Sequence, residues 1–193
     1  IPSWVARDRD VVLRSLDERY INAVDGYYKE LCKIFVPRLS TNGGPILAVA
    51  LENEFGGVAN DIPYLNKLAE ILTKYGVDVP YYTTDGAEQQ MLRLGTTDDC
   101  IMEGLNYRAV PGPAKNVLKF HEAMNPDRPF FVGELWAGRA IYWGDPFSYR
   151  KPEETSEAYR EALELGAYVN FYMFAGGTNF GPMSGGVVGY SFA

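Results

Sequence analysis

The sequence predicts an α/β protein with a parallel sheet, because short apolar runs alternate with longer stretches of helical periodicity along its 193 residues. Residues 46–51 form one such run, which reads Ile-Leu-Ala-Val-Ala-Leu without a polar residue. Unbroken apolar strands are typical of parallel sheets that helices cover on both faces. No sequence repeat and no low-complexity linker divides the chain, so we expect a single domain.

The same two patterns give the order of the elements. The apolar spacing predicts helices at residues 17–36, 63–75, 88–94, 114–124 and 153–165. Pro37 closes the first of these helices and Pro152 begins the last. Strands are expected near residues 46–51, 79–83, 101–105, 129–133 and 168–174. A complete (β/α)8 barrel needs about 250 residues, so five strand–helix units fall short of one by about three.

Composition and charge exclude several kinds of protein. The formal net charge is −7 and the charges are spread along the chain, which argues against a nucleic-acid partner. No apolar run approaches the length of a membrane span, so we expect no membrane partner. Cys32 and Cys100 lack metal-ligand spacing and are interpreted as two buried thiols. The single histidine, His121, argues against both a structural metal site and a Ser-His-Asp hydrolase.

Two glutamates emerge at the carboxyl ends of predicted strands. Glu54 follows residues 46–51, and Glu134 follows residues 129–133. In parallel α/β folds the active-site residues lie at this edge of the sheet. Cleavage of a glycosidic bond uses two carboxyl groups, which could be placed there. Each glutamate alone could instead cap a helix or pair with an arginine. Strand alternation also leaves open whether Glu52 or Glu54 is the functional residue, because both point to the same side.

Four segments resemble motifs of glycoside hydrolase family 35, the β-galactosidases. They appear in the family's order and span nearly the whole chain. The segments are GGPILAVALENEFGG at 43–57, YTTDG at 82–86, GELWAG with a later WG at 133–144, and YMFAGGTNFG at 172–181. Phe55 departs from the tyrosine that the family usually has, and Trp136 stands where tyrosine or phenylalanine is common. The resemblance implies a partial (β/α)8 barrel, approximately strands 4 to 8.

The resemblance also implies roles for individual residues. Glu54 would be the general acid/base and Glu134 the nucleophile of a retaining mechanism, with their carboxyl groups about 5 Å apart. Asn53 would bind the sugar 2-hydroxyl, and the Tyr172 hydroxyl would point into the sugar site. Three further substrate-binding candidates are weaker: Trp136, which could stack on sugar or simply pack, and Asn106 and Tyr107. No metal and no organic cofactor is expected.

On this interpretation, residues 1–193 are the C-terminal portion of a glycosidase (β/α)8 catalytic domain that lacks its first three strand–helix units. The expected function is that of a retaining exo-β-glycosidase acting on terminal β-D-galactosides, and the isolated chain would be inactive. One alternative enzyme is an exo-β-glucosaminidase. Another alternative is a non-catalytic truncated barrel that binds carbohydrate, or that assembles with another chain through its open sheet edges. The resemblance is compatible with a secreted, periplasmic or lysosomal protein, and the compartment stays open.

Overall fold

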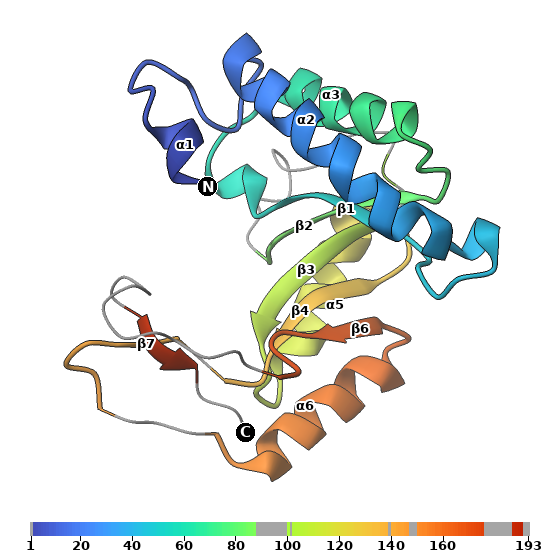
Figure 1. The fold of residues 1–193 in the computed structure, drawn as a ribbon. Coiled ribbons are helices and arrows are strands. Elements are labelled where there is room, and N and C mark those ends of the chain that lie inside the picture. The colour runs from blue at the N-terminus through green and yellow to red at the C-terminus, as the bar shows by residue number, and fades with distance from the viewer. Residues whose placement is uncertain are drawn as a thin grey trace.

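A five-stranded parallel sheet forms the centre of the protein. The computed structural model describes residues 2–87, 100, 102–138, 140–146, 150–175 and 187–190 (Figure 1). The sheet order is β1-β2-β3-β4-β6, so each strand pairs in parallel with the strand that precedes it in this sheet along the chain. The strands are β1 Val49–Asn53, β2 Tyr81–Gly86, β3 Met102–Arg108, β4 Phe131–Trp136 and β6 Tyr168–Phe171. The α/β class with a parallel sheet is therefore confirmed.

A second, two-stranded sheet lies apart from the first. It pairs β5 Ala140–Tyr142 with β7 Val187–Tyr190 in antiparallel fashion. The sequence predicts no strand in either segment. Runs of three or four residues are too short for apolar periodicity to reveal.

The helices begin where the sequence supplies capping groups. The Asp17 carboxylate accepts the Arg19 N–H at the start of α2, and Asp61 does the same for Tyr64 at the start of α3. Both α5 and α6 begin with proline in their first turn. The α-helices are α1 Ser3–Ala6, α2 Glu18–Phe35, α3 Ile62–Lys74, α5 Pro113–Met124 and α6 Pro152–Glu164. Short 3-10 helices are η1 Val36–Arg38, η2 Ser40–Asn42 and η3 Phe55–Gly57. Four of the five predicted helices are thus confirmed, and the fifth, 88–94, lies outside the described residues.

The strand bounds correct the predicted ones in a way that matters for the site. β3 continues to Arg108 instead of ending at 105, and β4 runs from 131 to 136. Asn106, Tyr107 and Glu134 therefore lie inside strands, where neighbouring side chains point to opposite faces. β6 ends at Phe171, and β1 begins only at Val49.

The helices pack on the sheet through two apolar clusters (Figure 1). One joins α2 and α3 to β1 and includes Phe55, whose ring contacts Tyr64 with centroids 5.2 Å apart. The other joins α5 and α6 to β3, β4 and β6. Cys32 and Cys100 are both buried, as expected. No helix in the described part of the chain is long and apolar enough to span a membrane.

Candidate active site

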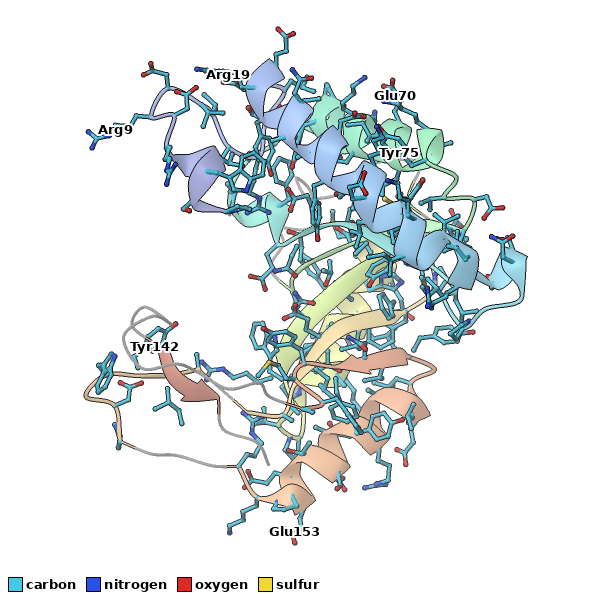
Figure 2. The ribbon with its side chains drawn as sticks, in the orientation of Figure 1. Arg9, Arg19, Glu70, Tyr75, Tyr142 and Glu153 are labelled. Carbon is cyan, nitrogen blue, oxygen red and sulfur yellow. The ribbon has the colours of Figure 1, made fainter. Side chains whose placement is uncertain are left out.

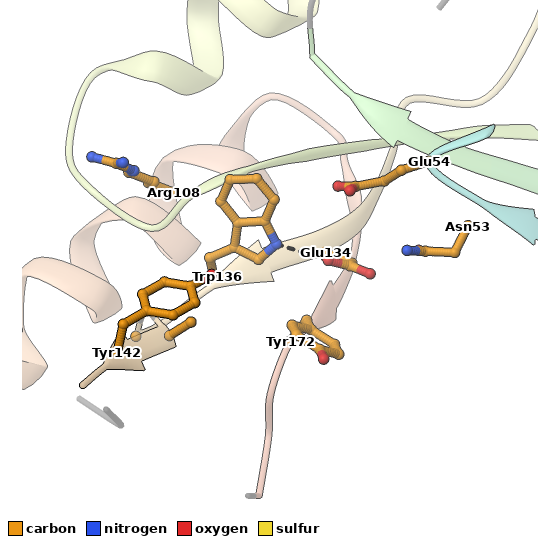
Figure 3. Close-up of a pocket in the computed structure, with 9 residues that line it drawn as sticks. Asn53, Glu54, Arg108, Glu134, Trp136, Tyr142 and Tyr172 are labelled. Atoms are coloured by element: carbon orange, nitrogen blue, oxygen red, sulfur yellow. Dashed lines mark hydrogen bonds between the residues drawn. The ribbon is translucent and has the colours of Figure 1, made fainter. Parts of the chain in front are cut away.

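A pocket of about 520 Å³ opens at the carboxyl edge of the parallel sheet. Figure 3 shows Asn53, Glu54, Trp136 and Tyr172 around Glu134. These five predicted site residues lie on β1 and β4 or directly after β1 and β6, so parallel strands bring together residues up to 119 positions apart. The lining is completed by Arg108, Gly138, Ala140 and Tyr142.

Glu54 is held in an unusual backbone conformation. It follows β1 with φ 50° and ψ 40°, in the left-handed region that residues other than glycine rarely occupy. Its N–H donates to the Thr84 carbonyl at 2.7 Å, and its Oε1 accepts from Asn106 Nδ2 at 3.1 Å. The Gly56 N–H donates to Asp85 Oδ1 at 2.8 Å, which fixes the turn that follows. The surroundings of Glu54 thus determine both its backbone and its carboxyl group.

Asn106 is oriented by a second bond. Its Oδ1 accepts from the Thr84 hydroxyl at 2.6 Å, which leaves Nδ2 directed at Glu54. The space for this pair depends on Gly133. A Cβ at that position would lie 2.2 Å from Thr84 Oγ1 and 3.1 Å from Asn106 Oδ1. Any larger residue there would push this network apart.

Glu134 is half-buried within β4 and accepts a hydrogen bond from Trp136 Nε1 on its Oε2 at 2.8 Å. Burial raises the pKa of the Glu134 carboxyl, because desolvation penalises the charged form. The Trp136 N–H opposes that rise, and the negative charge of Glu54 adds to it. The effect of the Glu54 charge on Glu134 agrees with the position of both residues in one pocket.

Two predicted substrate-binding residues lie elsewhere. Tyr107 is buried on the opposite face of β3, in the cluster with α5 and α6, and it does not line the pocket. Asn106 is only 2% exposed and lies behind Glu54 instead of in the open space. Both positions follow from the extension of β3, since consecutive residues of a strand cannot share a face. Tyr107 is therefore a core residue, and Asn106 contacts the candidate acid/base instead of the cavity.

Arg108 and Tyr142 line the pocket but were not among the predicted residues. Alternation along β3 could have revealed Arg108, because it lies two residues after Asn106. Tyr142 comes from the strand β5, whose three residues are too few to show a periodic pattern. Arg150 supports this side of the pocket by donating hydrogen bonds to the carbonyls of Trp136 and Ala137.

The side chains present are suited to acid–base and nucleophilic chemistry. Two carboxyl groups line the cavity together with an amide, an indole and phenol groups. Within the described ranges, no cluster of three or more His, Cys, Asp or Glu residues could hold a metal ion. His121 is buried away from the pocket, and its Nε2 lies 2.9 Å from the Arg128 carbonyl oxygen.

Several curated proteins that are similar to this chain are named β-galactosidase. One from Xanthomonas manihotis is 37% identical over 185 residues, which covers 95% of this chain and 30% of that protein. One from Macaca fascicularis is 35% identical and one from Mus musculus 36% identical, each covering 96% of this chain. These two alignments cover 27% and 29% of the relatives. The chain therefore spans less than a third of the length of these relatives.

The model of one protein family covers almost the entire sequence. It is the model described as glycosyl hydrolases family 35, and it matches residues 1–191. The match includes all the segments on which the resemblance was based. On this evidence the chain belongs to glycosyl hydrolases family 35.

Proposed function

We propose that the natural protein containing this chain is a retaining exo-β-glycosidase that hydrolyses terminal β-D-galactosides by double displacement. The observation that carries the proposal is the pair Glu54 and Glu134 in one pocket, with Asn53 beside them. The names of the relatives support galactose as the sugar. An exo-β-glucosaminidase is the competing enzyme, and its site would use the same carboxyl pair.

In the first step, the Glu134 carboxylate attacks the anomeric carbon while Glu54 protonates the leaving oxygen. The bond from Trp136 Nε1 supports this role, because it stabilises the charged form of Glu134 against the effect of burial. Asn53 would hold the sugar 2-hydroxyl, and Tyr172 would direct its hydroxyl toward the same ring. Trp136 offers a flat apolar surface at the wall of the pocket.

In the second step, Glu54 removes a proton from a water molecule that attacks the glycosyl-enzyme and releases Glu134. The intermediate ester carries no charge on Glu134, so the repulsion between the two carboxylates is absent while Glu54 acts as the base. Asn106 Nδ2 keeps the Glu54 carboxyl in place through both steps. The configuration at the anomeric carbon is inverted twice and thus retained.

We further propose that residues 1–193 contribute approximately strands 4 to 8 of a (β/α)8 barrel and lack its first three strand–helix units. The proposal is supported by five parallel strands in chain order and by the small share of each relative that the chain covers. In the described sheet β1 and β6 are edge strands, which further barrel strands or another chain would pair. If the coding sequence upstream held no such strands, a carbohydrate-binding or assembly role would replace the catalytic one.

The proposed activity can be tested on the natural full-length protein. Nitrophenyl β-galactoside and nitrophenyl β-N-acetylglucosaminide should be compared, and the first-formed anomer followed by NMR. We expect turnover of the galactoside with a β-anomer first, and covalent labelling of Glu134 by a 2-fluoro galactoside. An α-anomer as the first product would indicate an inverting enzyme, and preference for the glucosaminide would replace the sugar assignment.

A further inference from the structure

Arg14 reaches the Glu54 turn from the segment between α1 and α2. Its Nη2 donates to the Asn53 carbonyl at 2.7 Å. Its Nε and Nη2 also donate to Glu52 Oε1 and Oε2, at 3.3 and 3.1 Å. Its guanidinium carbon lies 5.3 Å from the centre of the Phe55 ring. One side chain thus contacts the residues on both sides of Glu54.

The peptide group that joins Asn53 to Glu54 is held at both ends. Its carbonyl accepts from Arg14, and its N–H donates to the Thr84 carbonyl at 2.7 Å. Because a peptide group is planar, two such bonds fix the orientation of the whole plane. Together with the Gly56–Asp85 bond, which holds the chain after Glu54, that orientation defines φ of Glu54, which is +50°. A backbone conformation of this kind persists where the surrounding structure determines it from several sides.

Arg14 itself has φ +53°, and within the described ranges it and Glu54 are the two residues other than glycine with positive φ. The two unusual backbone conformations therefore occur where the Arg14 side chain contacts the Glu54 turn. The charge of Arg14 is balanced by Glu52, which also accepts the Tyr64 hydroxyl at 2.6 Å. Tyr64 is buried in α3, so this helix keeps Glu52, and through it Arg14, in position.

We propose that Arg14 is a positioning residue that sets the backbone conformation of Glu54 and so directs its carboxyl group at the leaving oxygen. This inference rests on the proposed function, in which Glu54 is the general acid/base. Arg14 does not line the pocket and acts through the Asn53–Glu54 peptide group. Replacing Arg14 should therefore lower activity with the same dependence on the leaving group as replacing Glu54, but by a smaller factor.

The test compares leaving groups in the natural full-length protein. Arg14→Gln, Arg14→Lys and the control Arg19→Gln would be assayed for kcat/KM on an alkyl galactoside and on a dinitrophenyl galactoside. Arg19 is a suitable control because it lies in the first turn of α2, at the outer end of that helix (Figure 2), and pairs with Asp8 and Asp17. We expect Arg14→Gln to lose about 100-fold on the alkyl substrate, which needs a proton, and less than about tenfold on the activated one. Arg14→Lys should fall between wild type and Arg14→Gln, and Arg19→Gln should match the wild type.

Equal losses on both substrates would overturn the inference, as would wild-type rates in Arg14→Gln. If Arg14→Gln does not fold, Arg14→Lys and Tyr64→Phe decide, since the latter removes only the hydroxyl that supports Glu52. Both should show a smaller loss of the same leaving-group dependence. A wild-type protein that hydrolyses no galactoside would overturn the proposed function together with this inference. An active wild type with losses independent of the leaving group would overturn the inference alone.

Discussion

Glu54 lies after the end of β1 in a left-handed conformation, whereas Glu134 lies inside β4, in register with Asn106 of β3. The Glu54 turn accepts hydrogen bonds from Arg14 and Asn106 and donates hydrogen bonds to Thr84 and Asp85, which all come from distant parts of the chain. The position of Glu134 follows from strand register, and Trp136 two residues later orients its carboxyl group. Sheet pairing thus places one carboxylate, and long-range side-chain contacts place the other.

The largest effect is expected at Glu134. Glu134→Gln should abolish turnover on every galactoside, because an amide cannot form the glycosyl ester and no leaving group compensates for a missing nucleophile. Steady-state assays of the natural full-length protein with alkyl and nitrophenyl galactosides would measure this. Substantial activity on an activated substrate would show that Glu134 is not the nucleophile.

The loss of activity in Glu54→Gln should depend on the leaving group, unlike the loss in Glu134→Gln. On poor leaving groups we expect a loss of about 10²–10⁴ in kcat/KM, as is usual when a general acid is removed. On a dinitrophenyl galactoside the first step should be largely preserved, with a burst of dinitrophenol followed by slow turnover. Glu52→Gln tests the choice between the two neighbouring glutamates, because Glu52 faces Arg14 and Tyr64. A burst with Glu52→Gln and none with Glu54→Gln would reverse the assignment.

A smaller contrast is expected between two neighbours on β3. Asn106→Ala removes the Nδ2 donor to Glu54 and should lower kcat by about 10–100-fold, with KM changed little. Tyr107→Phe should leave activity unchanged, because the Tyr107 hydroxyl is buried on the opposite face and has no hydrogen-bond partner in the described structure. Kinetic constants for both variants would check this pair. A raised KM in Tyr107→Phe would restore the residue to the substrate site.

The contrast between the two carboxylates also explains which parts of the fold and of the candidate site could be predicted from the sequence. Both glutamates follow apolar runs, and their common edge could be predicted from the parallel arrangement alone. The helices were clear because their periodicity extends over many residues. The faces of Asn106 and Tyr107 were not, since they depend on where β3 ends to within two residues. The contacts of Arg14 could not be predicted either, because hydrogen bonds between residues 38 and 39 positions apart leave no periodic pattern in the sequence.

The strands next to the Glu54 turn also contain two buried acids, Asp85 and Glu103, that should make stability depend on pH. Asp85 holds Gly56, and Glu103 lies on the same face of the adjacent strand, where Asn125 donates to it at 2.5 Å. Burial raises the pKa of each to about 7, and the charge of Asp85 adds to the rise for Glu103. In an unfolded chain the pKa of each of these groups is about 4.

The folded state therefore binds more protons than the unfolded state between these values, so the stability from this pair is present at acid pH and is lost as pH rises toward 7. We expect the free energy of unfolding to fall by roughly 1–2 kcal/mol from about pH 4.5 to 7.5, less than the full shifts would give because buried sites relax. Asp85→Asn with Glu103→Gln should flatten this slope in urea unfolding of the natural protein. Glu157→Gln is the control, because Glu157 is an exposed residue of α6 whose pKa is lowered by its bond to Arg160. An unchanged slope in the double variant would mean that Asp85 and Glu103 do not titrate in this range and contribute to stability only through their hydrogen bonds.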